Sequence, residues 1–187
     1  FVSSVQRELE NERIAVSEII TTDTFLHTHC VPILYEYEPA SPDKAFLECI
    51  KCVDSCDIFF ILIWNEYGHV ENGISITHSE YKRAKEKKIP ILVYIKNSSD
   101  LQRKEEVKEK LLKEIYDDGY KYKCFANYKE LQTEVRFSLV KILKERGIEP
   151  SSDENEIAEQ TIEASSKFGS QPTKALWNSL NFKLVKQ

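Results

Sequence analysis

Glycine is scarce in this chain of 187 residues, which contains only five. The glycine-rich signatures of α/β nucleotide enzymes are missing: Ser3-Ser4-Val5-Gln6 stands where G-x-G-x-x-G would follow a first strand, and G-x-x-x-x-G-K-[ST] does not occur. The G-x-S-x-G elbow is missing as well. These absences argue against Rossmann-type dinucleotide binding, P-loop NTPase activity and an α/β-hydrolase nucleophile.

The sequence also lacks long hydrophobic runs and an N-terminal targeting signal. No apolar stretch approaches the roughly 20 residues that a membrane-spanning helix needs, and the N-terminus has no basic segment, apolar core and cleavage site in series. A net charge of -5 and a pI near 5.5 do not fit a nucleic-acid-binding domain. We therefore expect neither a membrane nor a direct nucleic-acid partner.

Methionine is absent altogether, and the chain begins at Phe1 inside what looks like a strand. We expect it to be a domain cut from a longer protein. The cysteine count is odd, at five, in a chain rich in Lys and Glu. This composition fits a reducing compartment better than a disulfide scaffold, so a cytoplasmic location is expected.

Three of the cysteines raise the question of a metal site. Cys49, Cys52 and Cys56 recur at i, i+3 and i+7, which places them on one face of a predicted helix. Free cysteine is among the most buried residue types, and no histidine stands close enough in sequence to complete a zinc pattern. The spacing therefore predicts core packing and no metal.

The middle of the chain predicts a βαβ unit. Two unbroken apolar runs, Ile58–Trp64 and Ile89–Ile95, have the length and the Ile, Val and aromatic content of parallel strands covered on both faces. A loop (Asn65–Ser75) and a helical segment (Thr77–Lys88) connect them, which is long enough for a crossover. Ligands of open α/β sheets bind outside the carboxyl ends of the strands. The loop and the start of the helix should therefore face any site.

A strand followed by a helix recurs five times over residues 1–147. The predicted strands are Phe1–Val2, Cys30–Tyr37, Ile58–Trp64, Ile89–Ile95 and Tyr120–Phe125, and the predicted helices are Val5–Ile20, Ser41–Ser55, Thr77–Lys88, Leu101–Tyr116 and Tyr128–Arg146. This pattern predicts an α/β, flavodoxin-like, doubly wound and mainly parallel five-stranded sheet with helices on both faces. Residues 148–187 change in composition, with one short helix expected over 155–166. They are interpreted as a linker and tail leading to a further domain, or as a tail that docks on the core.

Glu80 is the strongest candidate for a reactive group. A carboxylate in a pocket at the carboxyl edge of the sheet can stabilise or attack an oxocarbenium-like centre, which is its role in cleaving bonds to a sugar anomeric carbon. A structural explanation is available as well. Thr77-His78-Ser79-Glu80 has the T-x-x-E form of a capping box, in which Glu80 would only bind the amide of Thr77.

Other candidates follow the strand ends. Ser3 and Ser4 could hold a phosphate or ribose at a helix start, although Ser3 and Gln6 also fit a capping box. Tyr67 could stack on a base or ring, with Gly68 shaping the loop beneath the site. Glu36 could bind sugar hydroxyls or simply be solvated. Ser75 and Tyr81, near Glu80, complete the candidate ligand-binding residues, whereas His69 and His78 are interpreted as surface histidines.

Several of these segments together resemble a known group of domains. FVSS, YEYEPAS, CDIFFILIWNEYG and GISITHSEYKRAKEKKIPILVYIK are similar to the motifs of an uncharacterised TIR-like family. That family lies in the neighbourhood of TIR, SEFIR and nucleoside 2-deoxyribosyltransferase domains and usually forms the N-terminal module of larger bacterial signalling or defence proteins. The chain departs from the usual pattern in one place, since Asn65-Glu66 replaces the basic residue expected before Tyr67-Gly68.

The resemblance implies a catalytic carboxylate at Glu80. It implies a nucleotide-directed N-glycosidase of the NAD hydrolase or deoxyribosyltransferase type, with NAD as a candidate substrate, no cofactor, and self-association or a partner domain completing the site. A non-catalytic TIR-like sensing or oligomerisation module controlling a C-terminal effector is the alternative. A sensor that binds a nucleotide without cleaving it is a third interpretation.

Overall fold

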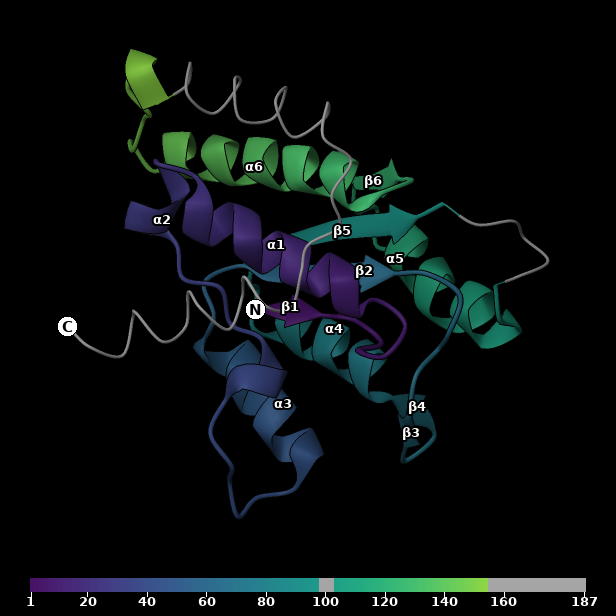
Figure 1. Cartoon of the computed structure of the whole chain (residues 1–187). Helices are drawn as coiled ribbons and strands as arrows, with labels where there is room; N and C mark the ends of the chain where they lie inside the picture. The colour runs from purple at the N-terminus through teal and green to yellow at the C-terminus, as the bar shows by residue number, and fades with distance from the viewer. Residues whose placement is uncertain (98–102, 155–187) are drawn as a thin grey trace. The chain divides into compact units, whose positions relative to one another are not determined.

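A computed structural model describes residues 1–97 and 103–154 (Figure 1). The predicted helix over 155–166 and the tail to residue 187 lie outside the described residues, as does part of the predicted helix Leu101–Tyr116. The chain divides into two compact units: residues 1–13 with 32–127, and residues 14–31 with the segment from residue 128. All the candidate site residues belong to the first unit.

The first unit is built on a four-stranded parallel sheet in the order β1-β2-β5-β6 (Figure 1). Its strands are β1 (Val2–Ser3), β2 (Phe59–Ile63), β5 (Ile91–Lys96) and β6 (Tyr122–Phe125). All five residues of β2 are buried, as its continuous apolar run predicts for a central strand. Strand β6 is an edge strand, with three of its four residues exposed.

Three helical segments share one hydrophobic core with alternate residues of the central strands. They are α3 (Ala45–Ser55), α4 (Ile76–Glu86) and the π-helix η2 (Val107–Leu112), which continues into α5 (Lys113–Asp117). The core includes Phe59, Ile61, Ile63, Ile91, Val93 and Ile95 from the sheet and Val53, Tyr81, Ala84, Leu111 and Ile115 from the helices. The predicted βαβ unit is confirmed, because α4 connects the parallel neighbours β2 and β5.

The prediction of a strand over Cys30–Tyr37 is wrong, and the described sheet has four strands where five were expected. One backbone hydrogen bond, from the amide of Val2 to the carbonyl of Ile33 at 3.0 Å, joins this segment to β1. Pro32 has no amide to donate, and Tyr35–Tyr37 turn into a short 3-10 helix, η1. Both features prevent a ladder from extending along the segment.

A small hairpin replaces part of the predicted loop between β2 and α4. Strands β3 (Val70–Glu71) and β4 (Ile74–Ser75) pair antiparallel around Asn72-Gly73. Both turn residues have positive φ, 54° and 84°, which is the backbone of a two-residue type I′ turn and the reason that Asn-Gly is favoured there. The turn brings the chain directly to the start of α4.

The second unit is helical. It holds most of α1 (Glu10–Thr22), together with α2 (Leu26–His29) and α6 (Tyr128–Glu145). A buried ion pair of 2.7 Å, from Arg136 Nε to Asp23 Oδ2, connects α6 to the turn between α1 and α2. The predicted C′ glycine is confirmed, since Gly147 has φ 79° and its amide bonds to the carbonyl of Lys144.

The first helix begins later than predicted, at Glu10 instead of Val5. Residues 5–9 form turns, with the amides of Glu8 and Leu9 bonded to the carbonyl of Val5. Ser3 consequently belongs to β1 and does not cap a helix. Within residues 1–97 and 103–154, no helix combines the length and apolarity needed to cross a bilayer.

Candidate functional site

Glu80 lies in the second turn of α4, and its side chain is 4% exposed. The helix begins at Ile76, and its N-cap is Ser75, whose Oγ accepts from the amide of His78 at 3.2 Å. Thr77 is therefore already inside the helix, and the predicted capping box is wrong. This result removes helix capping as the explanation for a glutamate at position 80.

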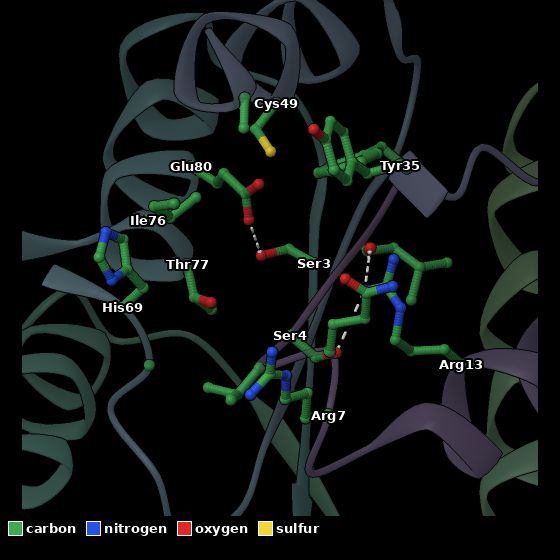
Figure 2. Close-up of a pocket in the computed structure, with 16 residues that line it drawn as sticks. Ser3, Ser4, Arg7, Arg13, Tyr35, Cys49, His69, Ile76, Thr77 and Glu80 are labelled. Atoms are coloured by element: carbon green, nitrogen blue, oxygen red, sulfur yellow. Dashed lines mark hydrogen bonds between the residues drawn. The ribbon is translucent and has the colours of Figure 1, made fainter. Parts of the chain in front are cut away.

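The carboxyl group of Glu80 meets two donors from different elements. The hydroxyl of Ser3, at the carboxyl end of β1, donates to Oε2 of Glu80 (Figure 2), and the Cys49 thiol on α3 is a second hydrogen-bond partner. Ser3 is 1% exposed and Cys49 is 6% exposed. A carboxyl group is thus held between a strand end and two helices, where water has little access.

Burial raises the pKa of Glu80 to about 7. The hydrogen bond from Ser3, the nearby charge of Arg13 and the hydrogen bond from Cys49 all act in the opposite direction, but they do not cancel the loss of hydration. The same surroundings raise the pKa of the Cys49 thiol, through burial first and the charge of Glu80 second. Cys49 is therefore a neutral donor and not a nucleophile.

Glu80 faces a cavity of about 500 Å³ at the carboxyl end of β1 (Figure 2). It is lined by residues of β1, the β1–α1 connection, α1, η1, α3, the loop after β2 and α4. They include Ser3, Ser4, Gln6, Arg7, Arg13, Tyr35, Cys49, Gly68, His69, Ile76, Thr77 and Glu80. The position agrees with the general rule for ligand sites in open parallel sheets.

Arg13 forms one wall of the cavity and is tightly fixed. Its Nε and Nη2 donate to the two carboxylate oxygens of Glu36 at 2.8 and 2.5 Å, and Nη1 donates to the carbonyl of Val2 at 2.7 Å. A further bond of 3.1 Å reaches the hydroxyl of Ser4 (Figure 2). Glu36 does not line the cavity. Its carboxylate is a bidentate partner that holds Arg13 in place.

Tyr67, Ser75 and Tyr81 do not line the cavity. The Tyr67 hydroxyl lies 2.8 Å from Nδ1 of His78, with the ring 5% exposed. Ser75 caps α4, and Tyr81 donates to Asp118 at 2.6 Å. Of the predicted ligand-binding residues, the structure brings Ser3, Ser4 and Gly68 together with Glu80 and keeps Glu36 behind Arg13.

Of the two neighbouring histidines that were predicted to lie at the surface, His69 is exposed and His78 is not. His78 is 4% exposed and lies between Tyr67 and Glu114, with Nε2 at 2.9 Å from the Glu114 carboxylate. Burial lowers the pKa of His78 despite that partner. His69 lines the cavity (Figure 2). The bond between His78 and Tyr67 fixes the loop that carries Gly68 and His69.

Sequence reasoning missed Arg7, Arg13, Tyr35, Cys49 and Thr77 as cavity residues. The sequence did contain a hint for Cys49, because its spacing with Cys52 and Cys56 predicted a helix face that packs in the core. Tyr35 lies beside β1 along a segment predicted to pair there. Arg7 had no signal of this kind, because the expected helix over residues 5–20 would have placed it on a helix surface.

A metal site is absent from the described part of the chain, where no three His, Cys, Asp or Glu side chains form a suitable group. Cys49 and Cys52 are buried, Cys56 is half-buried, and all three are free thiols. The prediction of core packing for the cysteine face is confirmed for the first two. The cavity offers one carboxyl group, several hydroxyls, two guanidinium groups, an imidazole, and the aromatic rings of Phe1 and Tyr35.

Comparison with known families gives one match. A family described as "Domain of unknown function (DUF4062)" matches residues 1–162. No curated protein and no solved structure matches the chain.

Proposed function

This chain belongs to the DUF4062 family of domains of unknown function, and we propose that it is a TIR-like N-glycosidase acting on a nucleotide. The observation that carries the proposal is the carboxyl group of Glu80, which is buried, has no role in capping α4, and faces a cavity at the carboxyl end of the sheet. Strongly shifted carboxyl groups in cavities are typical of functional sites. The strand order, with Ile33 bonded beside β1, supports the flavodoxin-like relationship.

The carboxylate of Glu80 supplies negative charge opposite the anomeric carbon of the sugar. As the bond from C1′ to the base nitrogen breaks, its electron pair leaves with the base, and positive charge develops on C1′ and the ring oxygen. Glu80 stabilises that charge or forms a bond to C1′. Water, or a second base, then adds to C1′ and loses its proton, and the carboxylate is regenerated.

NAD-type substrates fit this donor set best. Their pyridinium leaving group departs as a neutral base and needs no proton. Among the described residues, Glu80 is the only carboxylic acid that lines the cavity. Glycosidases that must protonate a leaving group use two acids, so a single carboxylate favours a cationic base.

The remaining cavity residues suit the other parts of a nucleotide. Tyr35 presents its ring to the cavity from the side opposite Glu80's helix (Figure 2), which makes it the aromatic surface on which a base can stack, the role predicted for Tyr67. Ser4, in the connection after β1, and Thr77, on α4, also line the cavity, and their hydroxyls can bond to a ribose.

The test is release of nicotinamide or free base from a panel of NAD, nucleosides and deoxynucleosides, followed by chromatography across pH 5 to 9. The reaction needs ionised Glu80, whose pKa is about 7. The value of kcat/KM should therefore rise about tenfold per pH unit below 7 and level off above it. Burial raises this midpoint, and Ser3, Arg13 and Cys49, the groups that face Glu80, lower it in part. Release that falls as pH rises through 7 would contradict a carboxylate role, and no release from any member would favour a non-catalytic module.

A further inference from the structure

The cavity contains a second arginine, and its situation differs from that of Arg13. Arg7 lies in the connection after β1, lines the cavity and is exposed. Within residues 1–97 and 103–154, no carboxylate pairs with it, whereas Glu36 takes up the charge of Arg13 through two hydrogen bonds. Figure 2 shows Arg7 at the side of the cavity away from Cys49 and Glu80.

The backbone beside Arg7 has unused donors as well. The amides of Val5, Gln6 and Arg7 have no hydrogen-bond partner within the described part of the chain, since the turn there uses only the amides of Glu8 and Leu9. All three residues line the cavity. A guanidinium group and neighbouring free amides are the usual ligands of a phosphate.

The charges of the cavity point the same way. Arg13 and Glu36 cancel each other, and the carboxyl group of Glu80 lies beyond Ser3. This leaves Arg7 as the uncompensated positive charge on the wall nearest the β1–α1 connection, among the residues that the structure describes. An anionic group bound there would lie in the same cavity as a sugar placed against Glu80.

We propose that Arg7 binds the 5′-phosphate of the substrate, so that the cavity selects nucleotides over nucleosides. The inference rests on the proposed function where cleavage is measured. The inference itself concerns how the substrate is recognised. Arg7 is a specificity-determining residue in this account and takes no part in breaking the bond. The proposed phosphate contact does not involve the loop in which Asn65-Glu66 replaces the basic residue of the family pattern.

Three compounds with the same leaving group test the proposal: nicotinamide riboside, nicotinamide mononucleotide and NAD. The first lacks a phosphate, the second has one, and the third has a diphosphate. The wild-type chain should cleave the two phosphorylated compounds with a kcat/KM about 10- to 100-fold above that of the riboside, the range of a charge-assisted contact. Arg7→Ala should lower the kcat/KM of the two phosphorylated compounds to about that of the riboside, and Arg7→Lys should restore part of the difference.

A matched control and a binding measurement separate the inference from the proposed function. Arg146→Ala removes another exposed arginine, which does not line the cavity. It should leave the kcat/KM of the mononucleotide and of NAD, each relative to the riboside, unchanged. Calorimetric titration of Glu80→Gln with the mononucleotide should show binding that Arg7→Ala weakens by a similar factor. If binding depends on Arg7 but the wild-type chain releases no base, the inference is supported and the proposed N-glycosidase activity is overturned. Equal cleavage of all three compounds, unaffected by Arg7→Ala, would overturn the inference alone, and no binding at all would overturn both.

Discussion

Replacing Glu80 by Gln should lower the rate of base release by about 10³-fold or more. Gln has nearly the same shape and can still accept the hydrogen bond from Ser3. It cannot carry the negative charge that opposes positive charge on C1′, and it cannot form an ester with the sugar. The loss should therefore appear in kcat, with substrate affinity little changed, because the interaction removed belongs to the transition state.

A control on the same helix makes this result interpretable. Glu86 also lies on α4, but its side chain is 66% exposed and pairs only with Arg83 among the described residues. Glu86→Gln removes an equal charge from the same element and should leave base release within about twofold of the wild-type rate. Undiminished release by the Glu80 variant, with folded structure verified by circular dichroism, would remove Glu80 from the mechanism.

The same substitution should make the folded protein more stable at pH 8. The pKa of Glu80 is 4.5 in an unfolded chain and about 7 in the folded one. Between these values the folded state holds a proton that the unfolded state releases, so the stability that this proton contributes is present in full below about 4.5 and is lost as pH rises through 7. The loss amounts to roughly 3 kcal/mol at about 1.4 kcal/mol per unit.

The glutamine side chain of the Glu80→Gln variant is neutral at every pH and avoids that loss, at a cost of about 1 kcal/mol for burying its amide. The free energy of unfolding in urea should therefore be roughly 2 kcal/mol higher for this variant than for wild type at pH 8, and no higher at pH 4. The difference between the two proteins isolates Glu80, because all other groups titrate in both. A variant less stable than wild type at pH 8 would mean that the ionised carboxylate is well solvated or well paired, which would contradict its proposed desolvation.

Such a result would express a trade-off between stability and function. Helix capping does not explain a buried acid that destabilises the fold at neutral pH, because Ser75 supplies the cap that the sequence alone would assign to Thr77 and Glu80. Residues at functional sites commonly lower the stability of the folded protein.

Much of the fold follows from local sequence patterns. The apolar runs of β2 and β5 and the glycine after α6 could be placed because each is a local signal of strong periodicity or special backbone. The errors lie where local signals compete with tertiary ones. Cys30–Tyr37 has strand-like composition, but Pro32 removes a donor, and the backbone turns at Tyr35.

Part of the candidate site could be predicted from the order of strands and helices. Ser3, Ser4 and Glu80 could be assigned to one sheet edge from topology alone, because the carboxyl ends of parallel strands meet there. The positions of Tyr67 and His78 could not be assigned in this way, because they result from contacts between elements. The Tyr67 hydroxyl lies against one nitrogen of the His78 imidazole, and Glu114 of α5 lies against the other. Arg7 enters the cavity only because α1 begins at Glu10 and leaves it on a turn.

The most direct test of the central claim, that Glu80 is a desolvated acid facing a nucleotide cavity, is the pH titration of its carboxyl carbon by NMR. Comparison with Glu80→Gln identifies the signal. We expect a midpoint near 7 in the free protein, and a change of chemical shift and midpoint when nicotinamide mononucleotide is added. A midpoint near 4.5 that does not move with any nucleotide would contradict the claim.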